Sequence, residues 1–140
     1  MPQSMTRAHP IGHPGYHETL PRSPESAATA RRLVRLALTA WGLREMAEDA
    51  VLVVSELAGN AVRHAEGRTI RVTVERPVPG RVRISVTDGS KVPPEPRRAD
   101  ARDENGRGLV LVTALAGDWG TTPLPTGKAV WAEMDGRRDG

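Results

Sequence analysis

Hydrophobic residues recur at helical spacing in two stretches of the N-terminal half of the chain. The first stretch predicts a helix over 23–41, because Ser23 offers a capping hydroxyl and Pro24 presets the backbone of the first turn. The second stretch predicts a helix over 45–65. Its apolar residues follow one another at steps of four, three and four, which defines a buried stripe of Met46, Ala50, Val53 and Leu57.

Elsewhere, β-branched residues alternate with polar ones, which is the pattern of half-buried strands. The runs 69–75 and 81–88 flank a turn with Pro79 and Gly80 and predict an antiparallel hairpin. Further strands are predicted at 16–20, 118–122 and 129–134, and a short apolar helix at 108–116. This order lacks regular βαβ alternation. It favours an α/β chain of the α+β two-layer sandwich type, with helices packed on one face of a mixed, mainly antiparallel sheet.

The ends of the chain and one internal segment break these patterns. Residues 1–14 are rich in Pro, Gly and His and are expected to form a disordered N-terminal tail, followed by one domain over 15–136 and a C-terminal tail over 137–140. Residues 89–105 contain three prolines and a mixed charge cluster. That segment is too long for an ordinary connection, and long loops of this kind are often lids over a site.

Composition narrows the classes of function. The 140 residues carry a formal charge of +3 and no cysteine, which excludes disulfides and thiolate metal sites and agrees with a reducing cytoplasm. No run approaches the roughly 20 apolar residues of a membrane span, so we expect a soluble, cytoplasmic protein without membrane contact. Because the arginines are scattered and aromatic residues are few, we expect no direct nucleic-acid binding.

The first candidate site lies on the second predicted helix. Glu56, Asn60 and His64 are four residues apart and share one side, so an acid, an amide and an imidazole line up. Asn60 interrupts an apolar stripe, and a buried carboxamide without partners costs roughly 1–3 kcal/mol. It therefore faces a satisfied network or a cavity. A solvated helix edge is the alternative, because periodicity does not distinguish an edge from a pocket.

Two further candidates involve glycines. Asp88 ends a strand and Gly89 follows it, so a carboxylate can accept a hydrogen bond from an exocyclic amine beside bare backbone. An ordinary Asp-Gly turn is the alternative. Glycines also precede the third predicted helix, in the run Asn105-Gly106-Arg107-Gly108-Leu109, where free N–H groups and the positive end of the dipole suit a phosphate. Here the alternative is a plain glycine loop.

Together, these residues resemble the N box and the two glycine boxes of the GHKL ATPases and, within these, the bacterial anti-sigma-factor serine/threonine kinases. The likeness spans residues 16–134. It is strongest in Glu56-Leu57-x-x-Asn60-Ala61-x-x-His64 and in Gly106-Arg107-Gly108-Leu109, with support from Trp119-Gly120 and Gly127-Lys128-Ala129-Val130-Trp131. The resemblance implies a Bergerat-type ATP-binding fold, a sandwich whose sheet and helices hold ATP beneath a flexible lid.

The resemblance also implies roles for the residues of the predicted helix. Asn60 would coordinate Mg²⁺ through its amide oxygen, which fits a metal that takes few protein ligands. Glu56 would orient or deprotonate the attacking hydroxyl. His64 would support Asn60 or approach a phosphate, with a satisfied core histidine as the alternative.

The nucleotide contacts implied by the resemblance come from the glycine boxes. Asp88 would bind the adenine amine and Gly89 would let the base lie close. The lid would meet the phosphates at a segment comprising Gly106, Arg107, Gly108 and Leu109. One departure concerns the first glycine box, which usually reads Asp-x-Gly-x-Gly in the family. In Asp88-Gly89-Ser90-Lys91-Val92 the glycine stands early and the second glycine is lacking. For Lys128, we expect a surface lysine in a turn, with contact to a phosphate as the alternative.

The leading functional hypothesis follows from that resemblance. It is an anti-sigma-factor serine/threonine kinase that transfers the γ-phosphate of ATP to a serine of a STAS-type anti-sigma-factor antagonist and binds a sigma factor, with a homodimer as the assembly the family suggests. The alternative is a non-catalytic partner-switching module that binds nucleotide and regulates transcription through protein contacts. The first hypothesis predicts phosphate transfer that depends on Glu56, and the second predicts unchanged function in Glu56→Ala.

Overall fold

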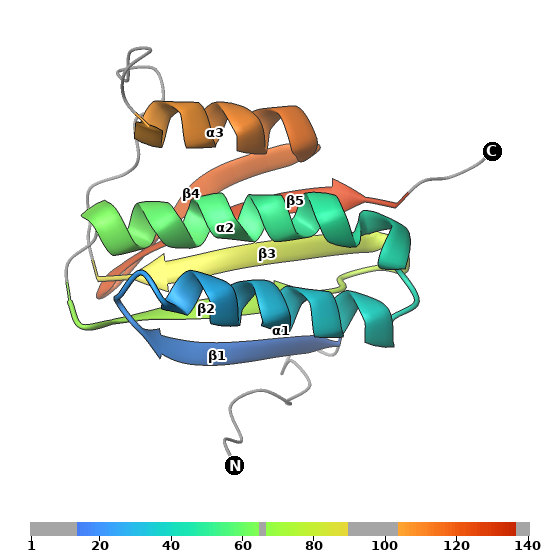
Figure 1. Cartoon of the computed structure of the whole chain (residues 1–140), viewed down its shortest axis with the longest axis horizontal. Helices are drawn as coiled ribbons and strands as arrows, with labels where there is room; N and C mark the ends of the chain where they lie inside the picture. Colours follow the sequence, from blue (N-terminus) through green and yellow to red (C-terminus); the bar gives the residue numbers. More distant parts are fainter. Residues whose placement is uncertain (1–13, 65–66, 90–103, 137–140) are drawn as a thin grey trace.

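Five strands form one sheet, and the helices lie together on one of its faces (Figure 1). The computed structural model describes residues 14–64, 67–89 and 104–136, and the side chains of the last segment from residue 110 onward. The expected N-terminal tail, apart from residue 14, and the expected C-terminal tail lie outside the described residues. Most of the expected lid loop does too. The predicted arrangement of helices on one face of a sheet is confirmed.

The strands pair in the order β1-β2-β3-β5-β4. Each of the four pairings among the described strands is antiparallel, so the mixed character expected of the sheet is absent there. The predicted hairpin is confirmed, with Val72 opposite Val86 and a positive φ of 85° at Gly80 in the turn. The strands are β1 Gly15–Pro21, β2 Thr69–Glu75, β3 Arg81–Asp88, β4 Asp118–Leu124 and β5 Gly127–Asp135.

In the described part of the chain, three α-helices cover the sheet, and they differ from the prediction at their ends. The second predicted helix is divided into a short 3₁₀ turn and a longer α-helix, because the chain tightens before the regular helix begins. The helices are α1 Ser26–Ala40, η1 Arg44–Met46, α2 Ala47–His64 and α3 Glu104–Leu115. Helix α2 lies between α1 and α3 and contacts β3 of the sheet below it.

The N-terminus of α1 corrects the prediction that Ser23 caps it. Glu25 occupies the cap position, and no side-chain hydrogen bond caps the helix. The Ser23 carbonyl instead accepts a hydrogen bond from the Ser26 N–H at 3.0 Å, which forms a turn ahead of the helix. The pKa of Glu25 is lowered by a hydrogen bond with its own backbone and by another with the Ser23 side chain. The Ser23 hydroxyl therefore forms its hydrogen bond with the Glu25 carboxylate and does not cap the helix. Small polar side chains often form such local hydrogen bonds.

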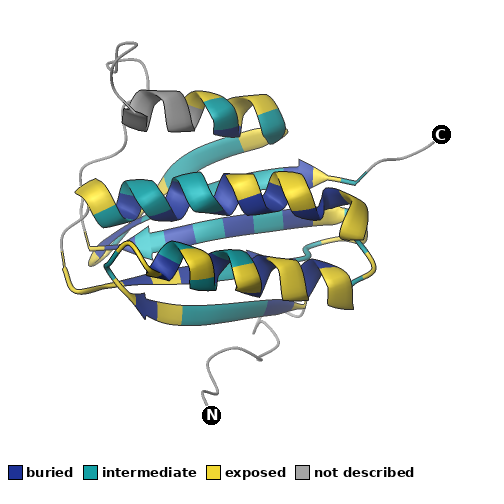
Figure 2. Cartoon of the chain, viewed as in Figure 1, coloured by how far each residue is buried: buried dark blue, intermediate teal, exposed yellow. Residues whose placement is uncertain are grey.

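The hydrophobic core lies between the helices and the covered face of the sheet (Figure 2). Leu57, in the predicted stripe of α2, is only 2% exposed. The covered rows of the central strands are apolar and buried, and comprise Val82, Ile84 and Val86 of β3 with Val130, Ala132 and Met134 of β5. The opposite face of these strands carries partly exposed residues such as Ser85 and Thr87. This is the usual division of an antiparallel sheet into a covered and an open face.

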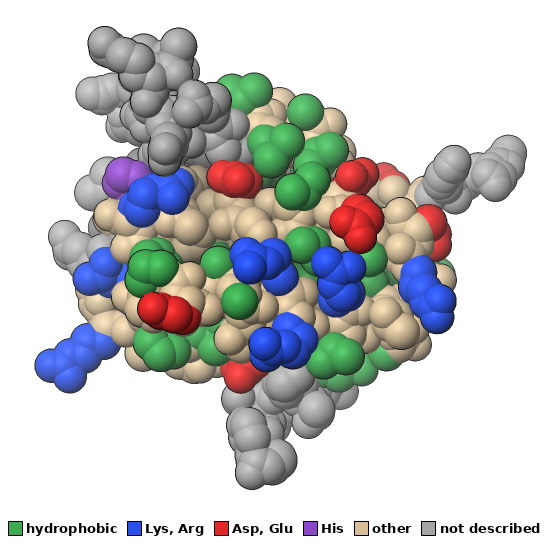
Figure 3. All heavy atoms as spheres, viewed as in Figure 1, with side chains coloured by type: hydrophobic (Ala, Val, Ile, Leu, Met, Phe, Trp, Pro, Cys, Tyr) green, Lys and Arg blue, Asp and Glu red, His purple; other side chains and the backbone are tan. Residues whose placement is uncertain are grey.

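The outer surface of the helix layer mixes charge types. Basic, acidic and hydrophobic groups are interspersed across it (Figure 3). Among the residues described, none of the helices has the length and hydropathy that a membrane crossing requires.

Candidate functional site

The residues singled out from the sequence gather at one end of the molecule. The last turns of α2, the end of β3, the first turn of α3 and the turn between β4 and β5 all lie at that end (Figure 1). Helix α2 contacts both β3 and α3, and β3 pairs with β5. We call this end the candidate corner. It carries Asn60, Asp88 and Gly106, which are far apart in the sequence.

The candidate residues of helix α2 differ in their exposure to solvent. Glu56 and Asn60 are half-buried, whereas His64, the last residue of the helix, is exposed. That exposure excludes the alternative of a core histidine. Arg63 donates a hydrogen bond from Nη2 to Oδ1 of Asn60 at 3.3 Å. The guanidinium lies over Gly59, where a Cβ would sit 3.4 Å from Arg63 Nη1. The carboxamide of Asn60 is thus neither fully buried nor without a partner.

The end of β3 carries a buried ion pair. Asp88 is 7% exposed, and both of its carboxylate oxygens lie 3.1 Å from Nζ of Lys128, which is 8% exposed. The two residues are opposite one another in the β3–β5 ladder. The expectation of a surface lysine in a turn was therefore wrong. Lys128 is the second residue of β5, and its side chain points to the face that the helices cover.

Close backbone approach explains the glycine that precedes this lysine. A Cβ added to Gly127 would lie 2.8 Å from Cα of Gly89, and it would collide with the carbonyl oxygen of Asp88. Real Cβ atoms do not come so near to backbone, so only glycine fits. The turn into β5 and the end of β3 are consequently locked together. The backbone segments on either side of the Asp88–Lys128 pair are therefore closely packed against each other.

The glycines of the third predicted helix correct another expectation. They were expected to precede the helix, but α3 begins at Glu104, so the run Gly106-Arg107-Gly108-Leu109 lies within it. A glycine inside a helix costs about 1 kcal/mol relative to alanine, and packing of α3 on α2 outweighs that cost here. Gly106 falls in the first turn, where backbone N–H groups lack an intrahelical acceptor, and Gly108 falls beyond it. The side chains of this run lie outside the described ones.

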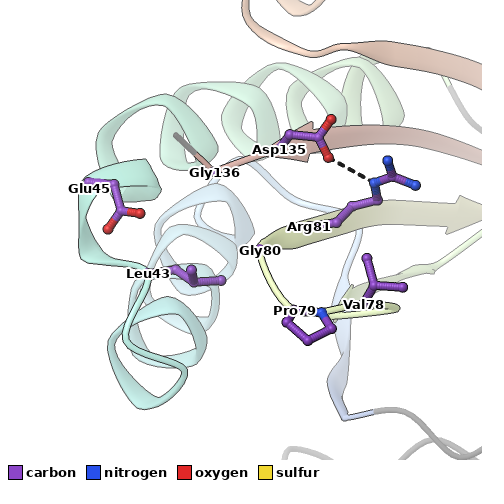
Figure 4. A pocket seen from close by; sticks show the side chains of 8 residues that line it. All are labelled: Leu43, Glu45, Val78, Pro79, Gly80, Arg81, Asp135 and Gly136. Carbon is purple, nitrogen blue, oxygen red and sulfur yellow. Dashed lines mark hydrogen bonds and ion pairs between the residues drawn. The ribbon is translucent and has the colours of Figure 1, made fainter. Parts of the chain in front are cut away.

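An open cavity of about 570 Å³ lies at the opposite end of the sheet (Figure 4). The hydrogen-bonded pair of Arg81 and Asp135 lines one side of it, and Glu45 of η1 lines the other. The turn residues Val78, Pro79 and Gly80 close it from below. None of the residues predicted to bind a ligand lines it. This cavity is therefore separate from the candidate corner.

The family of the chain is decided by a family model. The model described as a histidine kinase-like ATPase domain matches residues 20–134, which is most of the chain. The chain belongs to this family. The predicted GHKL membership and the Bergerat-type fold are thereby confirmed, and membership makes the chain an ATP-binding domain.

Two solved structures are similar to this histidine kinase-like ATPase domain. The structure of the RsbU and RsbW domains of Rv1364c from Mycobacterium tuberculosis matches with a TM-score of 0.69 and 24% identity, over 90% of this chain and 33% of that one. The chain thus spans about a third of that protein, and the likeness supports the fold alone. The histidine kinase domain of the blue-light-activated kinase EL346 from Erythrobacter litoralis matches at 22% identity over 78% of this chain and 60% of that one. The TM-score of that match is 0.48. No curated protein matches the chain significantly.

The sequence analysis did not identify two residues that contribute to the candidate corner, Lys128 and Arg63. Lys128 was assigned to a turn, although it has the same strand parity as Val130 and Ala132, and that parity places it on the covered face. Arg63 was not considered, although it follows Asn60 by three residues and so lies beside it on the helix. Both signals were present in the spacing of the sequence.

Proposed function

We propose that this histidine kinase-like ATPase domain is an anti-sigma-factor serine/threonine kinase. It binds MgATP at the candidate corner, transfers the γ-phosphoryl group to a serine of a STAS-type anti-sigma-factor antagonist, and binds a sigma factor. The observation that supports this most is the position of Asn60 and Asp88. They come from different elements, yet they lie at one end of the sheet together with the start of α3.

The residues of the corner suit an adenine nucleotide. Asp88 offers carboxylate oxygens to an exocyclic amine, and Gly89, which follows it, is exposed and has no side chain to obstruct a flat base. The first turn of α3 offers backbone N–H groups and the positive end of a helix dipole to the phosphates. Gly106 lies in that turn, so the backbone there is bare. Base and phosphates would thus be held by different elements.

The same corner suits Mg²⁺ as a metal with few protein ligands. Among the described side chains, in 14–64, 67–89 and 110–136, there is no group of three or more His, Asp or Glu that could hold a metal by itself. Mg²⁺ commonly takes one or two protein oxygens and completes its shell with water and phosphates. Asn60 would supply its amide oxygen after releasing or sharing the hydrogen bond from Arg63, which at 3.3 Å is long. When bound, the metal would offset the charge of the phosphates.

Glu56 would act on the hydroxyl that receives the phosphoryl group. It lies one helical turn before Asn60 on the same side of α2 and is half-buried, so it is accessible to a bound substrate. In phosphoryl transfer, the protein mainly positions groups and stabilises developing charge. A carboxylate that orients the serine hydroxyl and accepts its proton, beside an amide, is sufficient for that task. His64, exposed at the end of the helix, would assist at the phosphates.

A phosphotransfer assay tests this proposal against the non-catalytic alternative. The native chain, Glu56→Gln and the matched control Glu48→Gln, an exposed acid in the first turn of α2, are incubated with [γ-³²P]ATP, Mg²⁺ and a STAS-type antagonist protein. We expect label on the antagonist with the native chain and Glu48→Gln, and a loss of about 10²–10⁴-fold with Glu56→Gln, the usual size of a general-base effect. MgATP binding should survive in all three. Binding without any transfer by the native chain would favour a module that acts through protein contacts alone.

A further inference from the structure

The ion pair at the corner interrupts two apolar rows. On the covered face, β3 places Val82, Ile84 and Val86 in line with Asp88, and β5 places Met134, Ala132 and Val130 in line with Lys128. All six preceding residues are buried and apolar. Only the last position of each row is charged. The core packing of the sheet thus changes to a carboxylate–ammonium pair at the nucleotide end.

A buried ion pair at this position is expected to contribute little to the stability of the fold. Removing two charges from water costs several kcal/mol per ion, and the mutual attraction repays this only with good geometry. Well-packed apolar residues in place of a buried pair are often neutral or stabilising. The apolar residues next in each row show that the covered face accommodates such side chains. A charged pair here therefore points to recognition of a ligand.

The ion pair presents an ammonium donor beside a carboxylate acceptor. An ammonium has three N–H donors and no acceptor. Among the described residues, Lys128 Nζ donates its hydrogen bonds to the two carboxylate oxygens of Asp88, at 3.1 Å each. One N–H therefore remains for a further acceptor. The Lys128 side chain keeps 10% of its exposure, against 2% for Asp88, so it reaches nearer the surface.

The Watson–Crick edge of adenine has the complementary arrangement. Its 6-amino group is a donor, and the adjacent N1 is an acceptor; proteins read extracted bases at this edge through hydrogen bonds. We propose that Lys128 is a specificity-determining residue of the nucleotide site, which donates a hydrogen bond to N1 of adenine while Asp88 accepts one from the 6-amino group. This inference rests on the proposed nucleotide site at the candidate corner. It assigns a direct protein donor to the base nitrogen.

Calorimetry with an ATP analogue tests the assignment. 1-Deaza-ATP replaces N1 with C–H and keeps the 6-amino group and the phosphates, so it lacks only the acceptor. We expect the native chain and the control Arg81→Met to bind Mg-1-deaza-ATP about tenfold or more weakly than MgATP, the size of a hydrogen bond to a charged group. In Lys128→Met, the two nucleotides should bind with equal affinity. A purely structural lysine that only holds Asp88 would weaken both nucleotides and leave their ratio as in the native chain, which would overturn the inference.

A second measurement on the native chain remains informative if Lys128→Met does not fold. The sequence contains only two lysines, Lys91 and Lys128, so ¹⁵N-lysine labelling gives two side-chain signals, and Lys91→Arg assigns them. We expect MgATP to shift the Nζ resonance of Lys128 and Mg-1-deaza-ATP to leave it near its free position. Equal shifts with both nucleotides would overturn the inference while leaving ATP binding intact. Absence of binding by either nucleotide would instead overturn the proposed site and the inference with it.

Discussion

Strands β3 and β5 are joined by an ion pair at each end, and the two pairs differ in their surroundings. At the candidate corner, Lys128 and Asp88 keep 10% and 2% of their side-chain exposure. At the other end, Arg81 and Asp135 keep 44% and 64%, although their atoms approach more closely, at 2.8 Å. Both pairs are directly opposed in one ladder. The same two strands thus carry one buried ion pair and, at the other end, one exposed ion pair.

The difference follows from which face each pair occupies. Residues 88 and 128 share the parity of the core rows and lie under the helices, whereas 81 and 135 lie on the open face. A further pair on the open face, Arg83 with Glu133, is intermediate, with exposures of 30% and 25%, and its guanidinium stacks on Trp131 at 4.3 Å. Water weakens the exposed pairs and competes for their hydrogen bonds. Distance alone therefore says little about what an ion pair contributes.

Removing one partner of the buried pair should have the largest effect on stability. Lys128→Met leaves the Asp88 carboxylate buried without its ammonium, and the expected loss is about 3–5 kcal/mol in the free energy of unfolding. Urea denaturation followed by circular dichroism measures it. Arg81→Met is the matched control and should change the midpoint little. Equal losses in the two variants would contradict the contrast between the two ends.

Replacing both partners of the buried pair separates stability from recognition. Asp88→Leu combined with Lys128→Met continues the two apolar rows, so it should recover about 3 kcal/mol of the loss seen in the single variant. The same double variant should not bind MgATP, because no carboxylate remains for the base. Denaturation and calorimetry are measured on one preparation. Retained nucleotide binding in a stable double variant would show that the pair has no role in the site.

The two ends of β5 also differ in how tightly the backbone is packed around a glycine, and the expected effects on stability are smaller. A Cβ on Gly127 would collide with the backbone of Asp88, whereas a Cβ on Gly136 would meet the carbonyl oxygen of Gly80 at 3.3 Å. Gly127→Ala should therefore cost about 1–3 kcal/mol or more through backbone displacement. Gly136→Ala should cost clearly less, since its neighbour has only a few tenths of an ångström to give. Thermal unfolding of the two variants checks the order, and a reversed order would be inconsistent with the locked corner.

The exposed pair gives the smallest expected effect. The pKa of Arg81 is raised first by its hydrogen bond with Asp135 and then by the charge of that carboxylate. Because the folded-state pKa of Arg81 is raised, the stabilisation from the pair is fully present below the unfolded-state pKa and is lost only as the pH rises through the folded-state pKa, far above neutrality. No change in stability from this group is therefore expected between about pH 6 and pH 9. Melting curves of the native chain and Asp135→Asn across that range should stay parallel. Divergence would mean that the pair is less exposed than described.

The sequence predicts the periodic parts of this fold well. The bounds of β2 and β3 and the buried stripe through Leu57 follow from alternation and helical spacing, because one face of each element must be covered. The sequence predicts the structure less well where a local motif and tertiary packing favour different conformations. Ser23 looks like a helix cap but bonds with Glu25, and the glycines of α3 suggest a loop although packing on α2 extends the helix through them. Tertiary contacts decide both cases.

Some features of the candidate corner are likewise predictable from the sequence, and others are not. Asp88 at the end of a strand and Asn60 on a helix follow from pattern and family resemblance. Their position at one end of the molecule requires the sheet order, in which β5 lies between β3 and β4. That insertion also brings Lys128 opposite Asp88 across 40 residues of sequence. Such long-range pairing leaves no local signal beyond strand parity.

The central claim is that the buried end of the β3–β5 ladder holds the base of ATP. Calorimetry with MgATP on the native chain, Asp88→Asn and the opposite-end control Asp135→Asn tests it most directly, since both changes remove one carboxylate charge at constant size. We predict saturable binding by the native chain and by Asp135→Asn, and none by a folded Asp88→Asn. Undiminished binding by Asp88→Asn, or no binding by the native chain, would contradict the claim.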